Sequence, residues 1–340
     1  MYKYEDITQV HLETTQLCQA SCPMCDRNKN GGDVNHFLKN KSLSIEQFKH
    51  IFTIPFLKQL KTVYFCGNHG DPIFAPDCLD MFKYMREVNP YLNLGMTTNG
   101  GARKPEWWEE LAKYKVHVNF SIDGLEDTNH HYRQGVVWKN VEENLDAFIT
   151  SGGKADWTFL VFNYNEHQVE LARQYSKLLG VNKFVPKKSG RYITANMEKK
   201  EEHQAIFRKG LGTLLSQPNN PKWRNKALEK DFDIKKIIKE EKVCPKCVAK
   251  KEIYISAEGF LLPCCWTAGQ MYKWYLPEHS AQIWEHINKF DINTLNSSVK
   301  EVMESGFLES IEKAWTGESK LEVCAIKCNK VFDPFAAQWS

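Results

Sequence analysis

The chain has 340 residues, of which 42% are hydrophobic, so it can bury a large core and exceeds the usual length of one domain. Its net charge of +3 excludes a global field that would demand a nucleic acid or an acidic membrane as partner. The sequence shows neither a secretion signal nor the roughly 18 consecutive apolar residues of a membrane span, so we expect a soluble cytoplasmic protein.

Short β-rich runs alternate with amphipathic helical stretches from residue 10 to about residue 195. The helical stretches carry ordinary start and stop signals, such as the capping box that begins at Ser44. Six strands with five intervening helices predict βαβ units and a parallel sheet in a partial (β/α)6 barrel, with a doubly wound sheet as the competing topology. The candidate strands are 9–15, 62–67, 92–99, 116–124, 157–163 and 182–187.

The chain changes character after residue 195. Charged residues are dense over 196–243, which predicts solvated linking helices; their mixed signs make a weak pattern for nucleic-acid binding. A Cys-rich part follows, with a hairpin-like stretch that turns at residues 257–259. We therefore predict an α/β barrel domain over 1–195, a helical linker over 196–243 and a smaller domain over 244–340.

The eleven cysteines occur mostly in groups. With no secretion signal, grouped cysteines bind metal more often than they form disulfides. Cys66 and Cys78 stand alone in apolar surroundings, and we interpret them as buried core thiols. The groups are Cys18, Cys22 and Cys25; Cys244, Cys247, Cys264 and Cys265; and Cys324 and Cys328.

The first cysteine group directly follows the first predicted strand. In α/β architectures this carboxyl end of a strand is where sites assemble. Thiolates from Cys18, Cys22 and Cys25 can ligate three irons of a cubane and leave the fourth iron without a protein ligand. Such an open iron can chelate the amino and carboxylate groups of S-adenosylmethionine (SAM). A zinc site is the alternative, but it normally takes four ligands in two Cys-x2-Cys pairs.

The spacing Cys18-x3-Cys22-x2-Cys25 resembles the radical SAM superfamily, whose motif is Cys-x3-Cys-x-aromatic-Cys after the first strand of a partial barrel. Met24 stands at the aromatic position, where its thioether can fill the same apolar role near the adenine. The resemblance implies a 4Fe-4S cluster that cleaves SAM to a 5'-deoxyadenosyl radical, which then removes a hydrogen atom from a substrate. It also implies an electron donor such as a flavodoxin or ferredoxin.

The segment 66–72, Cys-Gly-Asn-His-Gly-Asp-Pro, follows the second predicted strand. It looks like the Gly-Gly-Glu-Pro stretch of the family, which receives the methionyl amino group, with Asp71 in place of Glu. Short polar side chains end the later strands and suit the ribose and the SAM carboxylate, although each alone also suits a turn or cap. The expected SAM-contacting residues are Met24, Gly67, Asn68, Gly70, Asp71, Thr98, Asn99, Ser121, Asp123, Arg133 and Asn163.

Between Cys247 and Cys264 lie eleven residues, Gly259 and four more residues. This matches the Cys-x9-15-Gly-x4-Cys opening of the SPASM and twitch domains, which hold auxiliary 4Fe-4S clusters. Six thiolates are too few for two complete four-Cys clusters, so one auxiliary cluster is expected; a structural zinc ribbon is the alternative. Cys265 adjoins Cys264 and would point to the opposite face of a strand. The expected ligands are Cys244, Cys247, Cys264 and Cys328, with Cys324 as substitute for one of them.

Proteins of this architecture often act on peptides or protein side chains, so a peptide or amino-acid-like substrate is the leading expectation. Only about eight residues precede the first strand, so the leader-binding domain of many peptide-modifying members is not expected. A nucleotide, tRNA or small metabolite is the alternative substrate, for which Lys187, Lys188 and Arg191 offer a phosphate-binding cluster, unless they form a solvated loop.

A hypothesis of another class is a non-catalytic iron-sulfur protein that transfers electrons or binds a partner. Such a protein would not need the polar residues of the SAM pocket. No catalytic acid or base is predicted.

Overall fold

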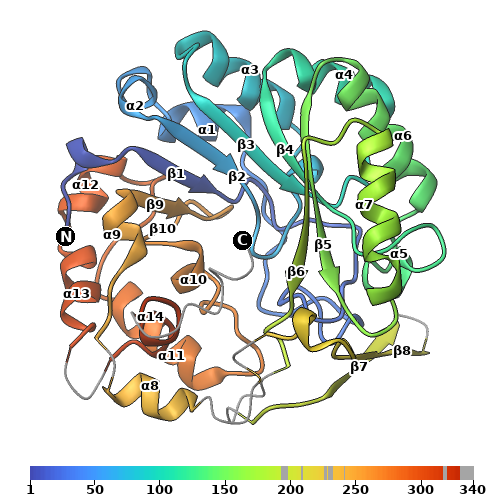
Figure 1. Ribbon diagram of the computed structural model, residues 1–340. Coiled ribbons are helices and arrows are strands. Elements are labelled where there is room, and N and C mark those ends of the chain that lie inside the picture. The colour runs from blue at the N-terminus through green and yellow to red at the C-terminus, as the bar shows by residue number, and fades with distance from the viewer. Residues whose placement is uncertain are drawn as a thin grey trace. The chain divides into compact units, whose positions relative to one another are not determined.

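The computed structural model describes residues 1–192, 198–207, 210–225, 228, 233–240, 242–316 and 320–329 (Figure 1). These residues form two compact units that are interleaved along the chain. Unit 1 contains the described residues of 1–17, 37–94 and 233–333, and unit 2 contains those of 18–36 and 95–232. The predicted domains are consecutive segments, and that division stays a prediction; its first boundary, at residues 195 and 196, lies outside the described residues.

Eight strands form one sheet in the order β10-β9-β1-β2-β3-β4-β5-β6 (Figure 1). The pairs β1–β2, β1–β9, β4–β5 and β5–β6 are parallel, and β10 is antiparallel to β9. The predicted α/β fold with a parallel sheet is therefore confirmed. The pairing of β9 with β1 was not predicted, because it joins segments about 240 residues apart in the chain. The strands are β1 Gln9–Leu12, β2 Thr62–Phe65, β3 Asn93–Thr98, β4 Val116–Ser121, β5 Lys154–Val161, β6 Lys183–Lys188, β9 Glu252–Ile255 and β10 Leu261–Leu262.

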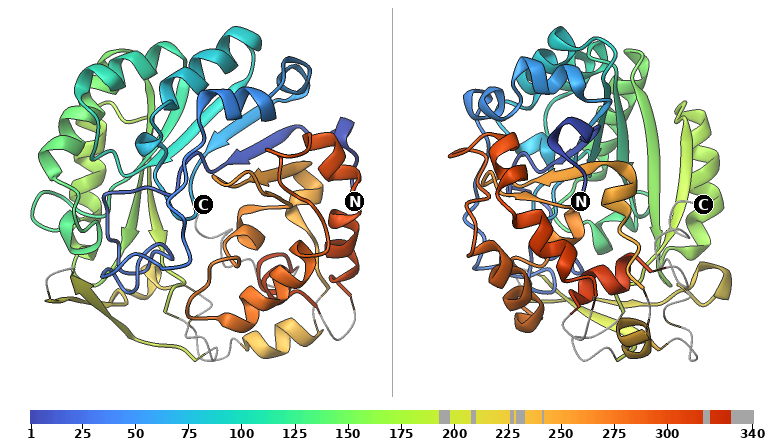
Figure 2. Two further views of the ribbon diagram at one scale, coloured as in Figure 1. Left: turned by 180° about the vertical axis from the view of Figure 1, so that it is seen from behind. Right: turned by 90° about the vertical axis from the view of Figure 1, so that its left-hand side faces the viewer.

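In unit 2, helices α4 (Pro105–Lys113), α6 (Trp138–Thr150) and α7 (Val169–Leu178) cover the outer face of β4, β5 and β6 (Figures 1 and 2). Aromatic side chains fill the layer between these helices and strands. Trp108 lies 5.2 Å from Phe120 between ring centroids, and both are fully buried. Burying a large apolar side chain stabilises a fold by about 1.5–3 kcal/mol, so this pair stabilises the packing of α4 against β4. Helix α5 (Asn129–Tyr132) belongs to the same unit.

A separate antiparallel pair, β7 (Glu202–Phe207) and β8 (Gly210–Ser216), also lies in unit 2. The sequence instead predicted solvated helices here. The strands bury Ala205 and Leu215, and this burial in a paired hairpin outweighs the high local charge that suggested helices.

In unit 1, the capping box predicted at Ser44 is present and begins α1. Ser44 accepts from the backbone N–H of Gln47 at 3.2 Å, and the Gln47 side chain accepts from the Ser44 N–H at 3.0 Å. Of the C-terminal helices, α9 contacts β9 and α10 contacts β10, whereas α11 and α12 contact α13, and α14 contacts α8 and α10. The helices of unit 1 are α1 Ile45–Ile51, α2 Ile54–Gln59, α3 Cys78–Val88, α8 Ile234–Glu240, α9 Lys246–Lys250, α10 Cys265–Ala268, α11 Pro277–Ile287, α12 Val299–Glu304, α13 Phe307–Lys313 and α14 Glu322–Lys327.

Candidate functional site

Cys18 lies in unit 2, at the start of the loop that follows β1. Its sulfur accepts the backbone N–H of Ala20 at 3.3 Å, and the side-chain amide of Asn99 lies 3.6 Å from it. Asn99 is itself held by Gln19, whose Nε2 donates to Asn99 Oδ1 at 2.7 Å. N–H groups directed at a sulfur stabilise its thiolate form, so this cysteine is prepared to bind a metal.

Cys22 is buried beside an ion pair. Arg133 Nε lies 2.6 Å from Asp123 Oδ2, and the Nη1 atom of the same guanidinium lies 3.8 Å from the Cys22 sulfur. Asp123 is 1% exposed, and its other oxygen accepts the backbone N–H of Leu160 at 2.6 Å. Burial raises the pKa of Cys22 to about 11, and Arg133 opposes this rise. The guanidinium therefore supplies the positive charge that a buried thiolate needs.

The third cysteine of the loop, Cys25, has a pKa raised by burial, with Arg191 as the largest opposing influence. Arg191 Nη1 also donates to the backbone carbonyl of Met24, so it is engaged with the cysteine loop. The Met24 side chain is buried, and its sulfur lies 3.9 Å from Ser189 Oγ. The predicted place of Met24 near the adenine stays a prediction.

These three thiols fit the donor set of an iron-sulfur cluster. All are free cysteines on one loop, and Cys22 is influenced by the charge of Cys25. Among the residues that the structure describes, no group of three His, Cys, Asp or Glu side chains is arranged to hold a single metal ion. A cubane differs from such a site because each thiolate binds a different iron, so its ligands need not converge on one point.

The remaining predicted residues of unit 2 lie at strand ends. Thr98 Oγ1 accepts the Gly100 N–H at 3.1 Å, which fixes the turn after β3. Gly100 has φ +70°, and a Cβ there would lie 2.8 Å from the Phe120 ring, so glycine is required. Ser121 Oγ lies 3.4 Å from Thr158 Oγ1, and the backbone N–H of Asn163 donates to Ser216.

The segment 67–72 lies in unit 1, where its glycines are explained by packing of the chain itself. A Cβ on Gly70 would lie 1.9 Å from the Thr15 carbonyl oxygen, and one on Gly67 would lie 2.3 Å from the Gly70 oxygen. Asn68 Nδ2 donates to the Cys265 carbonyl at 2.9 Å, and the buried Asp71 accepts the Ile73 N–H at 3.3 Å. These contacts give the turn a fixed conformation, with or without a ligand.

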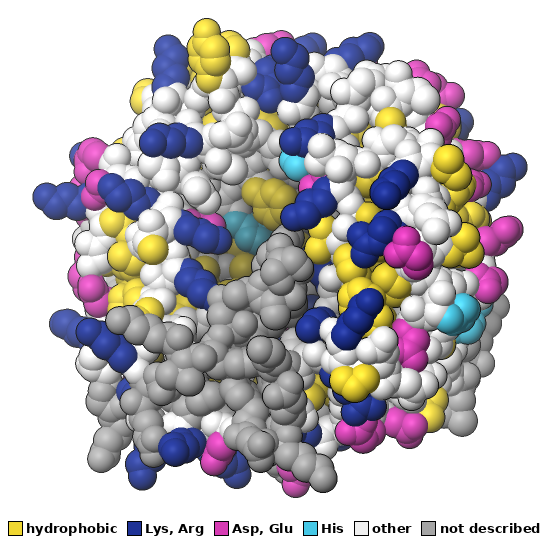
Figure 3. All heavy atoms as spheres, viewed as in Figure 1, with side chains coloured by type: hydrophobic (Ala, Val, Ile, Leu, Met, Phe, Trp, Pro, Cys, Tyr) yellow, Lys and Arg dark blue, Asp and Glu magenta, His cyan; other side chains and the backbone are white. Residues whose placement is uncertain are grey.

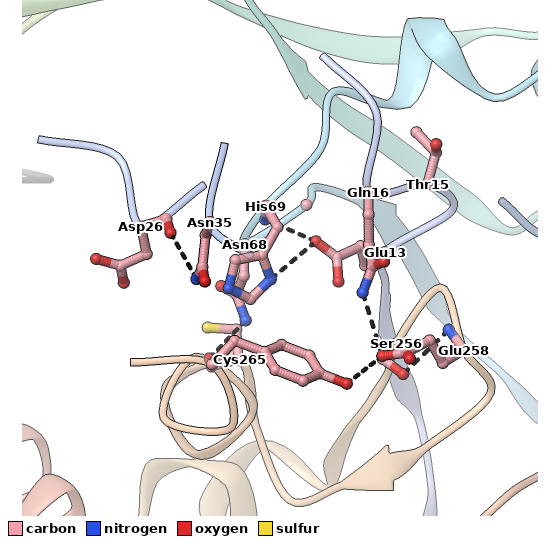
Figure 4. A network of polar contacts seen from close by, with 12 residues as sticks. Glu13, Thr15, Gln16, Asp26, Asn35, Asn68, His69, Ser256, Glu258 and Cys265 are labelled. Atoms are coloured by element: carbon pink, nitrogen blue, oxygen red, sulfur yellow. Dashed lines mark hydrogen bonds and ion pairs between the residues drawn. The ribbon is translucent and has the colours of Figure 1, made fainter. Parts of the chain in front are cut away.

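Glu13, a buried acid directly after β1, was not predicted as a site residue (Figure 4). It accepts the backbone N–H of His69 at 2.7 Å and the Tyr254 hydroxyl at 3.0 Å, while the His69 ring Nδ1 lies 3.7 Å away. Burial alone would raise the pKa of Glu13, but the contacts with His69 and Tyr254 lower it below its ordinary value. Glu13 directly follows β1 and His69 lies in the loop after β2, the parallel neighbour of β1. The order of the predicted strands 9–15 and 62–67 was the signal that could have brought them together.

Four C-terminal cysteines of unit 1 share one buried neighbourhood. Burial raises the pKa of Cys247, and the charges of Cys264 and Cys328 raise it further. The pKa of Cys324 is likewise raised by burial and by the charges of Cys247, Cys264 and Cys328. Burial raises the pKa of Cys264 to about 11. The expected ligand Cys244 lies beside this set through its backbone N–H, which donates to the Cys328 carbonyl.

Two further cysteines of unit 1 influence each other. The pKa of Cys265 is raised by burial and then by Cys264, Glu252 and Cys66. Cys66 is only partly buried, so its interpretation as a buried core thiol is wrong. It follows the carboxyl end of β2, an interior strand of the sheet. Cys78 is buried in α3 as expected.

Charges on the described surface agree with the near-neutral composition. Lys and Arg side chains are spread among acidic and uncharged ones on the face shown in Figure 3, rather than gathered in one patch. Lys187 and Lys188 lie half-buried on β6. Within the described part of the chain, no helix has the length and apolar character that crossing a membrane requires.

Comparisons with known proteins give one family model and several relatives of low sequence identity. Residues 12–175 match the model of the Radical SAM superfamily. The GTP 3',8-cyclase of Staphylococcus aureus strain Mu50 is 25% identical over 123 residues, and so is that of strain Mu3. Each match covers 36% of this chain and 36% of the relative, so it spans about a third of the curated relatives' length.

Two solved structures share the fold at low sequence identity. Streptococcus suis SuiB bound to S-adenosylmethionine is 15% identical with a TM-score of 0.57, and the match covers 94% of this chain and 72% of SuiB. Native anSMEcpe with bound AdoMet is 14% identical with a TM-score of 0.56, and the match covers 95% and 89% of the two chains.

Proposed function

Since residues 12–175 match the model of the Radical SAM superfamily, we propose that this protein is a radical SAM enzyme in which Cys18, Cys22 and Cys25 hold a 4Fe-4S cluster that cleaves SAM. Such a cluster would supply one electron to the sulfonium of SAM, so that the bond between sulfur and the 5'-carbon would break into methionine and a 5'-deoxyadenosyl radical able to take a hydrogen atom from the substrate. The observation that carries the proposal is the loop of three free thiols after β1, with N–H or guanidinium groups directed at two of their sulfurs.

The residues around the loop have distinct tasks in this proposal. The N–H groups of Ala20 and Asn99 hold the Cys18 thiolate in place. Arg133 balances the charge of the Cys22 thiolate, and Asp123 orients Arg133. Hydrogen bonds and positive charge at the sulfurs favour electron transfer to the cluster, since both raise its reduction potential.

For SAM itself we propose the polar residues at the carboxyl ends of successive strands, where ligands bind in open α/β sheets. Met24 would contact the adenine, and Asp71 with its neighbouring backbone would receive the methionyl ammonium. The buried, hydrogen-bonded state of Asp71 supports this role, because a fixed carboxylate needs little reorganisation on binding. The full proposed set is Met24, Gly67, Asn68, Gly70, Asp71, Thr98, Asn99, Ser121, Asp123, Arg133 and Asn163.

We further propose one auxiliary 4Fe-4S cluster in a SPASM/twitch-like C-terminal part. The mutual influence of Cys247, Cys264, Cys324 and Cys328 supports these four as ligands, and the backbone contact of Cys244 keeps it as a candidate. Four protein thiolates would complete the cluster and favour electron transfer or a structural role.

A peptide or amino-acid-like molecule is the proposed substrate. Streptococcus suis SuiB, in a structure bound to its precursor peptide SuiA, is 14% identical with a TM-score of 0.59 over 94% of this chain and 71% of SuiB. A nucleotide or small metabolite is the second candidate, because the GTP 3',8-cyclases match over 123 residues. A flavodoxin or ferredoxin in a reducing cytoplasm is the proposed source of electrons, which agrees with eleven free thiols.

Anaerobic reconstitution with iron and sulfide, reduction and incubation with SAM test the proposal. We expect 5'-deoxyadenosine and methionine in the wild type, measured by chromatography and mass spectrometry. The matched control Cys66→Ser should retain the activity, because Cys66 is not a proposed ligand. Iron incorporation without any 5'-deoxyadenosine in the wild type would instead support a non-catalytic iron-sulfur protein.

A further inference from the structure

A small groove in unit 1 is lined by none of the cysteines. It has a volume of about 220 Å³ and lies between two segments, residues 39–47 before and within α1 and residues 257–260 at the β9–β10 turn, with Asn293 and Leu295 beside the turn. This volume is below the roughly 300–1,000 Å³ of sites for drug-sized molecules, so its occupant must be small. None of the residues that line it has a part in the proposed SAM cleavage.

Glu258 is the buried polar group of this groove. Its side chain is 6% exposed, and Oε2 accepts hydrogen bonds from Gln16 Nε2 at 3.1 Å and from the Tyr272 hydroxyl (Figure 4). Oε1 accepts no hydrogen bond from any described residue. A buried carboxylate oxygen without a donor is costly, so a ligand that brings an N–H group to Oε1 would recover that free energy.

Lys39 gives the groove the opposite charge. Its Nζ lies 3.6 Å from Glu258 Oε1, too far for a hydrogen bond, and its side chain is 66% exposed. This ion pair is therefore weak and easily separated. Lys41 lines the same groove and adds a second ammonium.

Both walls of the groove are held in place by hydrogen bonds. Gln16 accepts the Lys41 N–H at 3.1 Å through its side chain and donates its own backbone N–H to the Lys41 carbonyl at 2.8 Å. On the other wall, Asn293 Nδ2 donates to the Glu258 carbonyl at 3.2 Å, and Thr294 donates to the Gly259 carbonyl. A groove with fixed walls loses little entropy when a ligand binds.

We propose that this groove binds a free α-amino acid with an aliphatic side chain. The ammonium group of the ligand donates to Glu258 Oε1, and the ligand carboxylate accepts from Lys39 and Lys41. Both charges of the weak Lys39–Glu258 ion pair therefore gain a partner. Ala257, Phe260 and Leu295 form the apolar wall for the side chain. Only a free amino acid carries both charges on one carbon, whereas a peptide separates them at its two ends.

Equilibrium dialysis of the reconstituted, oxidised protein with radiolabelled L-leucine tests the proposal, with saturating SAM present so that the open iron cannot chelate leucine. Isopentylamine and 4-methylpentanoate are matched competitors, since each keeps the side chain and lacks one charge. We expect saturable binding of leucine and at least about tenfold weaker competition by either analogue, because each loses one charge-assisted contact. An analogue that competes as well as leucine, or no leucine binding at millimolar concentration, would overturn the proposal.

Variants locate the site. Glu258→Gln and Lys39→Gln should each weaken leucine binding at least about tenfold, since each removes one of the two opposed charges. Lys39 is exposed, so its variant keeps the test valid even if Glu258→Gln disturbs the contacts with Gln16 and Tyr272. Lys58→Gln, an exposed lysine on α2, should bind leucine as the wild type does. Unchanged affinity in Lys39→Gln would contradict the proposed site.

Discussion

The two cysteine groups lie in electrostatically different surroundings. At Cys22 and Cys25 the strongest charge influence comes from an arginine, Arg133 or Arg191. At Cys247, Cys264 and Cys324 the strongest charge influence comes from another cysteine. Arg133 and Arg191 thus place positive charge near thiolates of the first group, whereas in the proposed auxiliary cluster the bound iron would have to supply it. This difference suits the proposal of a first cluster that exchanges ligands and an auxiliary cluster with four protein ligands.

The largest expected difference between the two groups appears when one cysteine is removed from each. Cys22→Ala should lose the first cluster and reduce 5'-deoxyadenosine formation by at least about 100-fold, because no other group places an open iron against SAM. Cys264→Ala should keep SAM cleavage without substrate and lose the iron of the second cluster. Iron analysis and the cleavage assay measure both. Equal iron content in Cys22→Ala and wild type would contradict the assignment.

Arg133→Met should destabilise the protein by about 3–5 kcal/mol, since it leaves the buried Asp123 carboxylate without its partner. Urea unfolding of the protein without its clusters measures this free energy. Arg173→Met is the matched control, because its partner Glu170 is mostly exposed and the pair contributes little. If Arg133→Met lowered the free energy of unfolding no more than Arg173→Met does, the buried Asp123 carboxylate would not depend on Arg133.

Glu13→Gln should cost about 1–3 kcal/mol at neutral pH, because it weakens the contacts to His69 and Tyr254. The lowered pKa of Glu13 means that its contribution is present above the ordinary carboxyl pKa and is lost as the pH falls below it. The difference in unfolding free energy between wild type and variant should therefore shrink on acidification. A difference that grows in acid would contradict the lowered pKa.

The smallest effect is expected for Asn99→Ala, which removes one N–H donor from Cys18 and leaves that of Ala20. The rate of SAM cleavage should fall about tenfold while the cluster still assembles, since loss of an outer hydrogen bond typically costs 10- to 100-fold. Cleavage rate and iron content, measured on the same preparation, separate the two effects. Loss of iron would assign Asn99 a role in cluster assembly instead.

The sequence predicted features that depend on local spacing. The parallel strands, the cysteine loop at the end of β1 and polar residues such as Asn99 and Asp123 at later strand ends all follow from periodicity and motif order. Features that need distant contacts were missed. Tyr254 reaches Glu13 across 241 positions, and Arg191 reaches Met24 across 167. The hydrophobic periodicity of a single segment cannot predict contacts between distant segments, because these contacts depend on how the sheet is assembled.

Electron-nuclear double resonance of the reduced protein with SAM labelled with 15N at the methionyl amino group tests the central claim most directly. We predict a 15N coupling to one cluster that is present in the wild type and in Cys264→Ala and absent in Cys22→Ala. Zinc in place of iron at Cys18, Cys22 and Cys25, or a cluster whose spectrum SAM leaves unchanged, would contradict the account.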